Sequence, residues 1–420
     1  MSPRKFQAIK GTRDILPGEI SSWHRIEAAA RELFPRYGYR EIRTPVFEET
    51  ELFARGIGAE TDIVSKEMYT FEDQGGSSLT LRPEATAGIV RAVIEHNLAA
   101  DDPAPKFWAL GPMFRRERPQ KGRYRQFHQV DVEAFGMSRP SIDAEIVEVA
   151  LAYLEACGLR DCELVLNSTG DAKCRPAYVE TLRAALRKEA GRLCADCQRR
   201  TETNPLRVLD CKVPEDQPVI EGLPRIGDHL CAECRDHFAE VRRELDLLGI
   251  RYRLDHRLVR GLDYYTRTTF EVTSGALGAQ NSVLGGGRYD GLVKELGGPD
   301  LTGIGFALGM ERLVMLLPQP ADEGRCDVFL APLVPDALDP ALLLQRDLRR
   351  AGLRVLMENE GRGLKSQMKK ADKLRARFVA IRGEDERAKD VWMVRDMAGS
   401  VQEEVKAGDV ARHLEAKLRG

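Results

Sequence analysis

The stretch "FRRERPQKGRYRQFHQVDVEAFG", residues 114–136, changes from basic to acidic character within a few positions. Its first part, residues 115–125, holds six basic side chains in eleven positions. Its second part places Gln129, Asp131 and Glu133 at strict two-residue spacing, with apolar residues between them. Residues two apart in a strand share a face. The second part is therefore predicted to be a strand with one polar and one apolar face.

The segment "KFWALGPMF", residues 106–114, predicts a partner strand, so the arginine-rich residues form the tip of a long β-hairpin. Arginine presents a rigid fork of donors that binds phosphate or carboxylate at two points. A run of charge is often only a solvated loop. Here the neighbouring carboxylates favour instead a pocket that binds a small cation-bearing molecule next to a phosphate.

The composition places few limits on the partners of this chain. The 420 residues suit two or three domains, and 64 basic residues nearly balance 66 acidic ones. Any nucleic acid must therefore bind to local basic surfaces rather than to an overall field. Neither a signal-peptide run nor a membrane-length apolar segment is evident, so we expect a cytoplasmic protein without a membrane partner.

The order of the patterns predicts two domains. Residues 1–320 read as an α+β domain built on a mostly antiparallel sheet, with a helical, charged insertion at about 170–250. The composition of "PQPADEGRC", residues 318–326, is typical of a linker. Strands then alternate with helices over residues 326–420, which predicts a small α/β domain with parallel strands.

Three further segments carry candidate site residues. In "LTLRPEAT", residues 79–86, Arg82, Glu84 and Thr86 alternate along another strand end, which again combines an arginine with a carboxylate. A salt bridge at a strand edge would explain this pattern equally well. "RGLDYYTRT" adds Arg260 and two tyrosines, of which we expect one in the core and the other in a site. "GIGFALGMER" places Arg312 near a helix start, and its glycine spacing does not fit a dinucleotide fold.

Taken together, "KGTRDILP", "FRRERPQKGRYRQFHQVDVEAFG", "LVRGLDYYTRTTFE" and "GIGFALGMERL" resemble, in order, the motifs of class II aminoacyl-tRNA synthetases. The arginine-rich hairpin resembles the second motif of that family, and the glycine-rich strand with its helix resembles the third. "RGLDYYTRT" is similar to histidyl-tRNA synthetases in particular. The resemblance covers essentially the whole chain, including a terminal domain similar to the anticodon-binding domain of that subclass.

This resemblance implies a role for each matching residue. Arg115 would hold the α-phosphate of ATP, Arg312 the γ-phosphate, and Arg260 would lie beside the histidine carboxylate; these three are the candidate catalytic residues. The implied ATP-binding residues are Arg115, Glu117, Arg123 and Arg312. The implied histidine-binding residues are Glu84, Thr86, Gln129, Glu133, Tyr264 and Tyr265, with Glu84 and Gln129 at the amino group and Glu133 and Tyr265 at the imidazole.

The implied enzyme is an ATP-dependent histidine–tRNA ligase that uses Mg²⁺, acts on L-histidine and tRNA(His), and forms a homodimer. The alternatives are a non-catalytic paralogue serving as a regulatory subunit, a synthetase for another amino acid, and an RNA-binding protein. Eroded arginines and a missing terminal domain would mark the regulatory paralogue, and this sequence shows neither.

The nine cysteines favour a metal site or burial over disulfides. Cys194 and Cys197 form one Cys-x-x-Cys pair, and Cys231 and Cys234 form another. Two such pairs predict one structural zinc bound by four thiolates. The gap between the pairs is longer than in simple zinc ribbons, Cys211 is a possible substitute ligand, and reduced packed thiols are the alternative.

Overall fold

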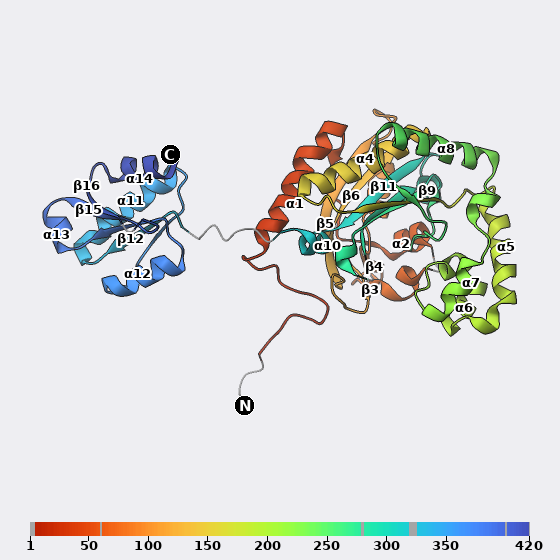
Figure 1. Ribbon diagram of the computed structural model, residues 1–420, viewed down its shortest axis with the longest axis horizontal. Coiled ribbons are helices and arrows are strands. Elements are labelled where there is room, and N and C mark those ends of the chain that lie inside the picture. The colour runs from red at the N-terminus through yellow and green to blue at the C-terminus, as the bar shows by residue number, and fades with distance from the viewer. Residues whose placement is uncertain (1–4, 59–60, 279–280, 319–325, 400, 420) are drawn as a thin grey trace. The chain divides into compact units, whose positions relative to one another are not determined.

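The computed structural model describes residues 5–58, 61–278, 281–318, 326–399 and 401–419 (Figure 1). The chain divides into two compact units, Met1–Pro320 and Ala321–Gly420. Most of the linker predicted at 318–326 lies outside the described residues. No helix among the residues described is long and apolar enough to cross a membrane.

The first unit is built on an eight-stranded sheet of order β1-β5-β6-β11-β10-β9-β7-β8. Its edge pairs β1–β5 and β7–β8 are parallel, and every other neighbouring pair is antiparallel. This arrangement confirms the predicted α+β class. The strands are β1 Arg40–Glu41, β5 Lys106–Phe114, β6 Gln126–Phe135, β7 Glu163–Ser168, β8 Arg253–Leu254, β9 Thr266–Thr273, β10 Ser282–Arg288 and β11 Gly303–Gly309.

Strands β5 and β6 form the predicted hairpin, paired from Lys106 opposite Ala134 to Phe114 opposite Gln126. The apolar face of β6 packs into a large core with helices α1 (Ile20–Leu33), α4 (Pro140–Cys157) and α10 (Met310–Leu316). Figure 1 shows α1 and α4 lying along this side of the sheet. The polar face of β6 is thereby turned to the opposite side.

A second, smaller sheet has the order β2-β4-β3. Its strands are β2 Phe47–Glu49, β3 Tyr69–Glu72 and β4 Ser78–Leu81, and β3 and β4 form a hairpin. From strand β4 the chain continues to the side of the large sheet on which the polar face of β6 lies. Helix α2 (Thr50–Ile57), the π-helical turn Ile63–Glu67, helix α3 (Thr86–Glu95) and the short α9 (Leu292–Glu295) belong to the same region. A second core, which includes residues of α3, α9 and β5, lies here.

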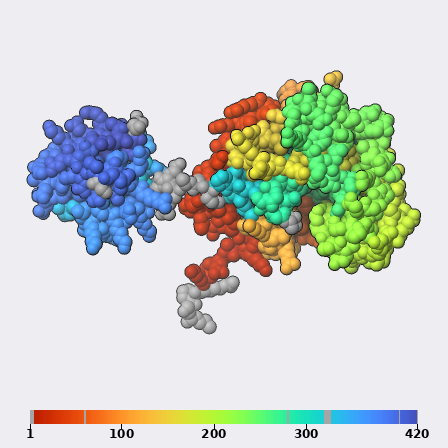
Figure 2. Space-filling model, in the orientation of Figure 1, coloured from red at the N-terminus to blue at the C-terminus, as the bar shows by residue number. Residues whose placement is uncertain are grey.

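The insertion follows β7 and has its own small core. It comprises α5 (Arg175–Lys188), α6 (Ala195–Thr203), α7 (Gln217–Glu221) and short 3₁₀ turns, and it ends in α8 (Ala232–Leu247). Figure 2 shows it, in green, as a closely packed lobe of the first unit. Val241 and Leu245 of α8 join the large core instead, so this last helix ties the insertion to the sheet layer.

The second unit has a five-stranded sheet of order β13-β12-β14-β15-β16. Strands β12 (Val328–Pro332), β13 (Val355–Met357) and β14 (Phe378–Arg382) are parallel, as predicted. Strands β15 (Val391–Asp396) and β16 (Gln402–Lys406) continue it in antiparallel fashion, which the sequence pattern had not revealed. The helices are α11 Leu338–Arg350, α12 Leu364–Lys373, α13 Glu384–Ala388 and α14 Val410–Arg419.

Candidate active site

The polar face of β6 forms the floor of a buried site. Gln129, Asp131 and Glu133 are exposed by 8%, 0% and 2% respectively. On β11 they face Gly309, Ala307 and Gly305. These small neighbours leave room above the strand, because side chains of ordinary size there would cover the three polar groups.

Gly305 makes the closest approach of these small residues. A Cβ atom added at Gly305 would lie 1.8 Å from Oε2 of Glu133 and 2.3 Å from the carbonyl oxygen of Val132. Contacts this short are impossible without movement of the main chain. The site therefore requires glycine at this position, for reasons of space rather than of backbone angle.

A cavity of about 130 Å³ lies over this floor. Of the residues predicted from sequence, Glu84, Thr86, Arg115, Gln129, Glu133, Arg260, Tyr264 and Tyr265 line it. Both tyrosines line the cavity, as the resemblance implied, and both also belong to the second core, so the expected division of one in the core and one in a site is wrong. Lining residues not assigned a role from sequence include Asp131, Tyr289 and Gly285. A larger, more open hollow over α2 and β2 contains none of these groups.

Glu133 is held by two hydroxyl groups. Thr86 Oγ1 donates a hydrogen bond of 2.6 Å to Oε1, and the Tyr289 hydroxyl donates to Oε2. Burial raises the pKa of Glu133 to about 8, although these two hydrogen bonds lower it. Tyr289 lies in "LGGGRYDGL", where the glycines drew attention away from the tyrosine.

Asp131 is fully buried, and neither of its carboxylate oxygens has a hydrogen-bond partner among the described residues. The Oε1 atom of Gln129 is likewise unpaired within that part of the chain. Burial, reinforced by the Glu84 carboxylate, raises the pKa of Asp131 to about 8. Buried polar atoms normally have partners, so these acceptors indicate a site for a donor from outside the chain.

Glu84 caps the start of α3 with its side chain. Its two oxygens accept hydrogen bonds of 2.9 Å each from the backbone N–H groups of Thr86 and Ala87. Burial raises the pKa of Glu84, and the bond from Ala87 opposes that rise. Ala85 has a φ of −98°, so alanine fits this turn without strain.

Two arginines border the cavity. Arg115 donates from Nε to the carbonyl oxygen of Pro83 at 2.8 Å, and its guanidinium lies 5.3 Å from the ring centroid of Phe127. Arg260 donates from Nη1 to Oε2 of Glu271 at 2.7 Å. Each guanidinium is thus oriented by one fixed acceptor and retains further donors.

The remaining predicted ATP-binding residues, Glu117, Arg123 and Arg312, do not line this cavity. Arg123 Nη1 donates to Glu117 Oε2 at 2.7 Å, and Glu117 Oε1 lies 3.8 Å from Arg115 Nη1. Arg312 Nη1 donates to the Ser282 carbonyl oxygen at 2.6 Å. Burial lowers the pKa of Arg312, and the charge of Arg123 lowers it further. Glu117 thus links Arg123 to Arg115, the arginine of the hairpin that lines the cavity.

The four-thiolate zinc site predicted from sequence is wrong in its pairing. Cys194 and Cys197 lie with Cys211 and Asp216, whereas Cys231 and Cys234 lie with Asp171 and Cys174. The fold thus places the two Cys-x-x-Cys pairs in two separate groups. Asp171, Cys174 and Asp216 were missed because a single cysteine or aspartate carries no spacing signal.

The antiparallel sheet with its arginine-bordered cavity is consistent with the fold of a class II aminoacyl-tRNA synthetase, the class that the sequence motifs resemble. A family model for histidyl-tRNA synthetase matches residues 11–313, and one for an anticodon binding domain matches residues 327–417. The chain belongs to the histidyl-tRNA synthetase family. Its second unit is the anticodon-binding domain of that fold.

Similar proteins from other organisms support the same family assignment. The histidine–tRNA ligase of Koribacter versatilis is 52% identical, covering 97% of this chain and 96% of that protein. The histidine–tRNA ligase of Solibacter usitatus is 53% identical, covering 98% and 99%. The crystal structure of apo S. aureus histidyl-tRNA synthetase is 37% identical, with a TM-score of 0.81 over 98% of this chain and all of that one. The prediction of an ATP-dependent aminoacyl-tRNA ligase is confirmed, and the regulatory paralogue is disfavoured.

Proposed function

We propose that this cavity is where L-histidine is joined to ATP as an adenylate, before transfer to the 3′ end of tRNA(His). The observation that carries the proposal is the set of buried acceptors on β6. Asp131 and Gln129 present unpaired oxygens, and Glu133 lies two residues further along the same face. An amino acid with a cationic ammonium and a second polar group supplies the donors that these oxygens lack.

The amino group of histidine is assigned to Gln129, Glu84 and Asp131. Glu84 already accepts two backbone hydrogen bonds, so Asp131 adds the carboxylate whose oxygens are still unpaired. An ammonium group next to Asp131 would lower the pKa of that carboxyl and bring it to its charged form. Binding of histidine therefore relieves the cost of burying Asp131.

The imidazole is assigned to Glu133 and Tyr265. Thr86 and Tyr264 line the same part of the cavity. Thr86 and Tyr289 fix the Glu133 carboxyl in one orientation. Burial raises the pKa of Tyr265, so its hydroxyl stays protonated. An amino acid without imidazole nitrogens would leave these buried groups unpaired, which is strongly discriminating.

Arg115 is assigned to the α-phosphate, Arg260 to the histidine carboxylate, and Arg312 and Arg123 to the outer phosphates. A histidine carboxylate oxygen attacks the α-phosphorus and pyrophosphate leaves, so the protein needs to position and neutralise charge rather than supply a nucleophile. ATP brings Mg²⁺, which prefers carboxylate oxygens. Glu117 accepts a hydrogen bond from Arg123, and Glu271 accepts one from Arg260. These two carboxylates are the groups that would hold the ion.

The second unit is proposed to bind tRNA(His) through helix α12 and the residues after it. Gln367 and Ala371 are buried, while Lys365, Lys369, Lys373 and Arg375 are exposed. Lys370 is partly engaged, because its Nζ lies 3.0 Å from Oε2 of the buried Glu358. Exposed cations of this kind suit a phosphate backbone, but do not read bases.

Self-association is proposed through the outer face of the sheet β2-β4-β3. Phe47 and Phe71 are exposed by 49% and 45%, and they flank Leu79 and Leu81 on the same face. An apolar face of this kind is typical of an interface. Sedimentation of the wild type as a dimer and of Phe47→Asp as a monomer would support it; a monomeric wild type would contradict it.

Histidine-dependent exchange of labelled pyrophosphate into ATP tests the proposed activity. We expect exchange with histidine and none with the other amino acids, followed by charging of tRNA(His). Exchange that is absent with histidine, or present with another amino acid, would refute the assignment. Charging without prior exchange would refute the adenylate route.

A further inference from the structure

Two groups of potential metal ligands lie in the insertion, outside the proposed active site. One consists of Asp171, Cys174, Cys231 and Cys234, and the other of Cys194, Cys197, Cys211 and Asp216. In each group the three sulfur atoms and one carboxylate oxygen all lie within 4.8 Å of one another. Each group therefore has the number and kind of ligands that a tetrahedral zinc site uses.

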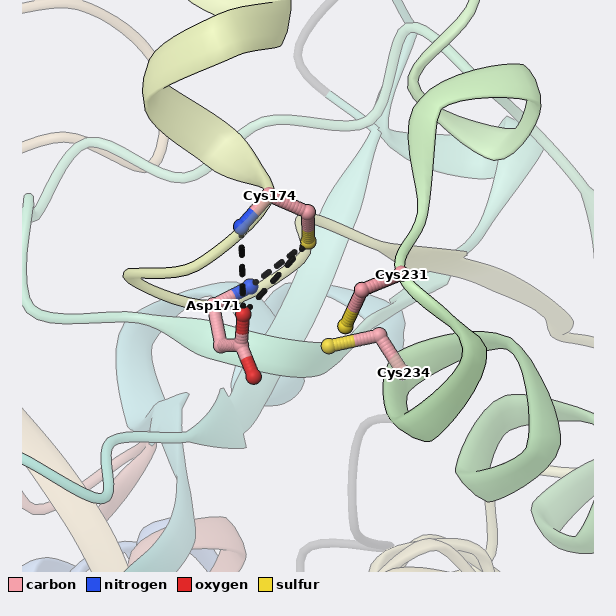
Figure 3. A group of neighbouring side chains, drawn as sticks. All are labelled: Asp171, Cys174, Cys231 and Cys234. Atoms are coloured by element: carbon pink, nitrogen blue, oxygen red, sulfur yellow. Dashed lines mark hydrogen bonds between the residues drawn. The ribbon is translucent and has the colours of Figure 1, made fainter.

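Figure 3 shows the first group. Cys174 lies at the start of α5, Cys231 and Cys234 lie at the start of α8, and Asp171 comes from the loop before α5. The side chains of Cys231 and Cys234 point toward Asp171 and Cys174 across the gap between these two helix ends. Two segments about sixty residues apart in sequence thus converge on one point.

Local backbone geometry supports this convergence. Asp171 N–H donates to Cys174 Sγ at 3.4 Å, and Cys174 Sγ lies 3.5 Å from Asp171 Oδ1. Gly170 has a φ of +65°, and a Cβ atom there would lie 2.7 Å from Cys174 Sγ. The loop thus turns through a glycine that leaves room for the sulfur. Arg267 Nη2, 3.6 Å from Asp171 Oδ2, partly offsets the negative charge of the group.

The second group is held by a separate set of contacts. Cys194 is the N-cap of α6, and its sulfur accepts a hydrogen bond of 3.5 Å from Cys197 N–H. Val213 N–H donates to Cys211 Sγ at 3.4 Å. Asp216 accepts from Cys194 N–H at 2.8 Å and lies 3.2 Å from Cys211 Sγ. Backbone N–H groups directed at sulfur stabilise thiolates, the form that binds metal.

We propose that the insertion binds two transition-metal ions, one in each group, each through three thiolates and one carboxylate. Three sulfur ligands favour Zn²⁺ over the hard cations Mg²⁺ and Ca²⁺. Ligands about 3.8 Å apart are expected around a tetrahedral zinc with bonds of about 2.3 Å, so each group needs only small side-chain movements to close on the ion. The two ions would fix the start of α5 to that of α8, and the start of α6 to the turn before α7.

The first group also connects to the histidine cavity. Arg175, next to Cys174, donates from Nη2 to the carbonyl oxygen of Tyr265 and from Nε to that of Thr169. Arg267 N–H donates to the Gly170 carbonyl oxygen at 2.7 Å. The loop that holds the metal ligands is therefore bonded to the main chain at Tyr265 and at Arg267, two residues further along. A metal ion here would stabilise the support of a cavity residue without touching the substrate.

The test is the metal content of the full-length protein, purified under reducing conditions with zinc present and then dialysed. Mass spectrometry of the metal should find two zinc ions per chain. Cys234→Ser and Cys197→Ser should each retain one, and the double variant none. Cys162→Ser is the matched control, because Cys162 lies outside both groups, and it should retain two.

Cobalt titration of the wild type gives a second measurement that needs no variant. Two equivalents should produce sulfur-to-cobalt charge-transfer absorption and strong tetrahedral bands. Protein without metal whose thiols all react, or whose pairs are joined as disulfides, would overturn the proposal. One ion per chain would overturn the two-site assignment. Neither measurement depends on aminoacylation, so a failure to bind metal and a failure of the proposed function are separate results.

Discussion

Replacing Asp131 with Asn should change how the stability of the histidine-free protein depends on pH. In the folded protein burial raises the pKa of Asp131 to about 8, from an ordinary value of 3.8. Between these values the unfolded chain has released the proton that the folded chain keeps. The free energy of unfolding of the wild type therefore falls by about 1.4 kcal/mol per pH unit for this one group. Asparagine does not titrate.

The advantage of Asp131→Asn over the wild type should therefore grow from about pH 4 to about pH 8. By pH 7 this advantage should amount to about 2–4 kcal/mol. Glu133, whose pKa is also raised to about 8, adds a similar slope to both proteins. The variant should thus keep a pH dependence that is weaker than that of the wild type.

Denaturant unfolding followed by tryptophan fluorescence measures this slope. Trp23 and Trp108 are buried in the first unit, and Trp392 lies in the second. A Trp392→Phe background confines the signal to the first unit. Saturating histidine should flatten the wild-type slope, because the ammonium stabilises the charged carboxylate. Equal slopes for wild type and Asp131→Asn without histidine would refute the idea that Asp131 is buried in its protonated form.

Three further changes give separate tests. Arg115→Ala should reduce histidine-dependent pyrophosphate exchange by at least about a thousandfold with an unchanged melting curve; an active variant would contradict its role. Gly305→Ala should destabilise the first unit by about 1–3 kcal/mol or more and impair histidine binding, whereas Gly291→Ala, with nothing within 4 Å of its Cβ, should change little. Arg175→Ala should raise the KM for histidine more than it lowers kcat while leaving the metal content unchanged; a fall in kcat alone would contradict indirect positioning of Tyr265.

Much of the site could be predicted from sequence because its signals are local. Alternation on one strand indicated the polar face of β6, and arginine density indicated the hairpin tip. The position of Tyr289 could not be predicted in this way, since it follows β10 and reaches Glu133 of β6 across the intervening strand β11. Only the pairing of β6, β11 and β10 brings the two together.

The metal ligands illustrate the same limit. Spacing identified Cys194 with Cys197 and Cys231 with Cys234 correctly as pairs, but it could not say which residues each pair would meet. That depends on the path of the chain between them, through α6, α7 and the 3₁₀ turns. Tertiary packing decides which distant segments meet. A Cys-x-x-Cys motif therefore identifies two of the four ligands and not the other two.

Gly305 has a consequence for how this enzyme can fail. It is set opposite Glu133 by the register of β11 against β6, with Ile304 and Phe306 on either side. A shift of one residue in that pairing would place one of these large side chains over Glu133 and reverse the faces of β11. The hollow that accepts the amino acid would then be filled. An error in strand alignment during folding would thus abolish substrate binding even in a chain that reached a compact state.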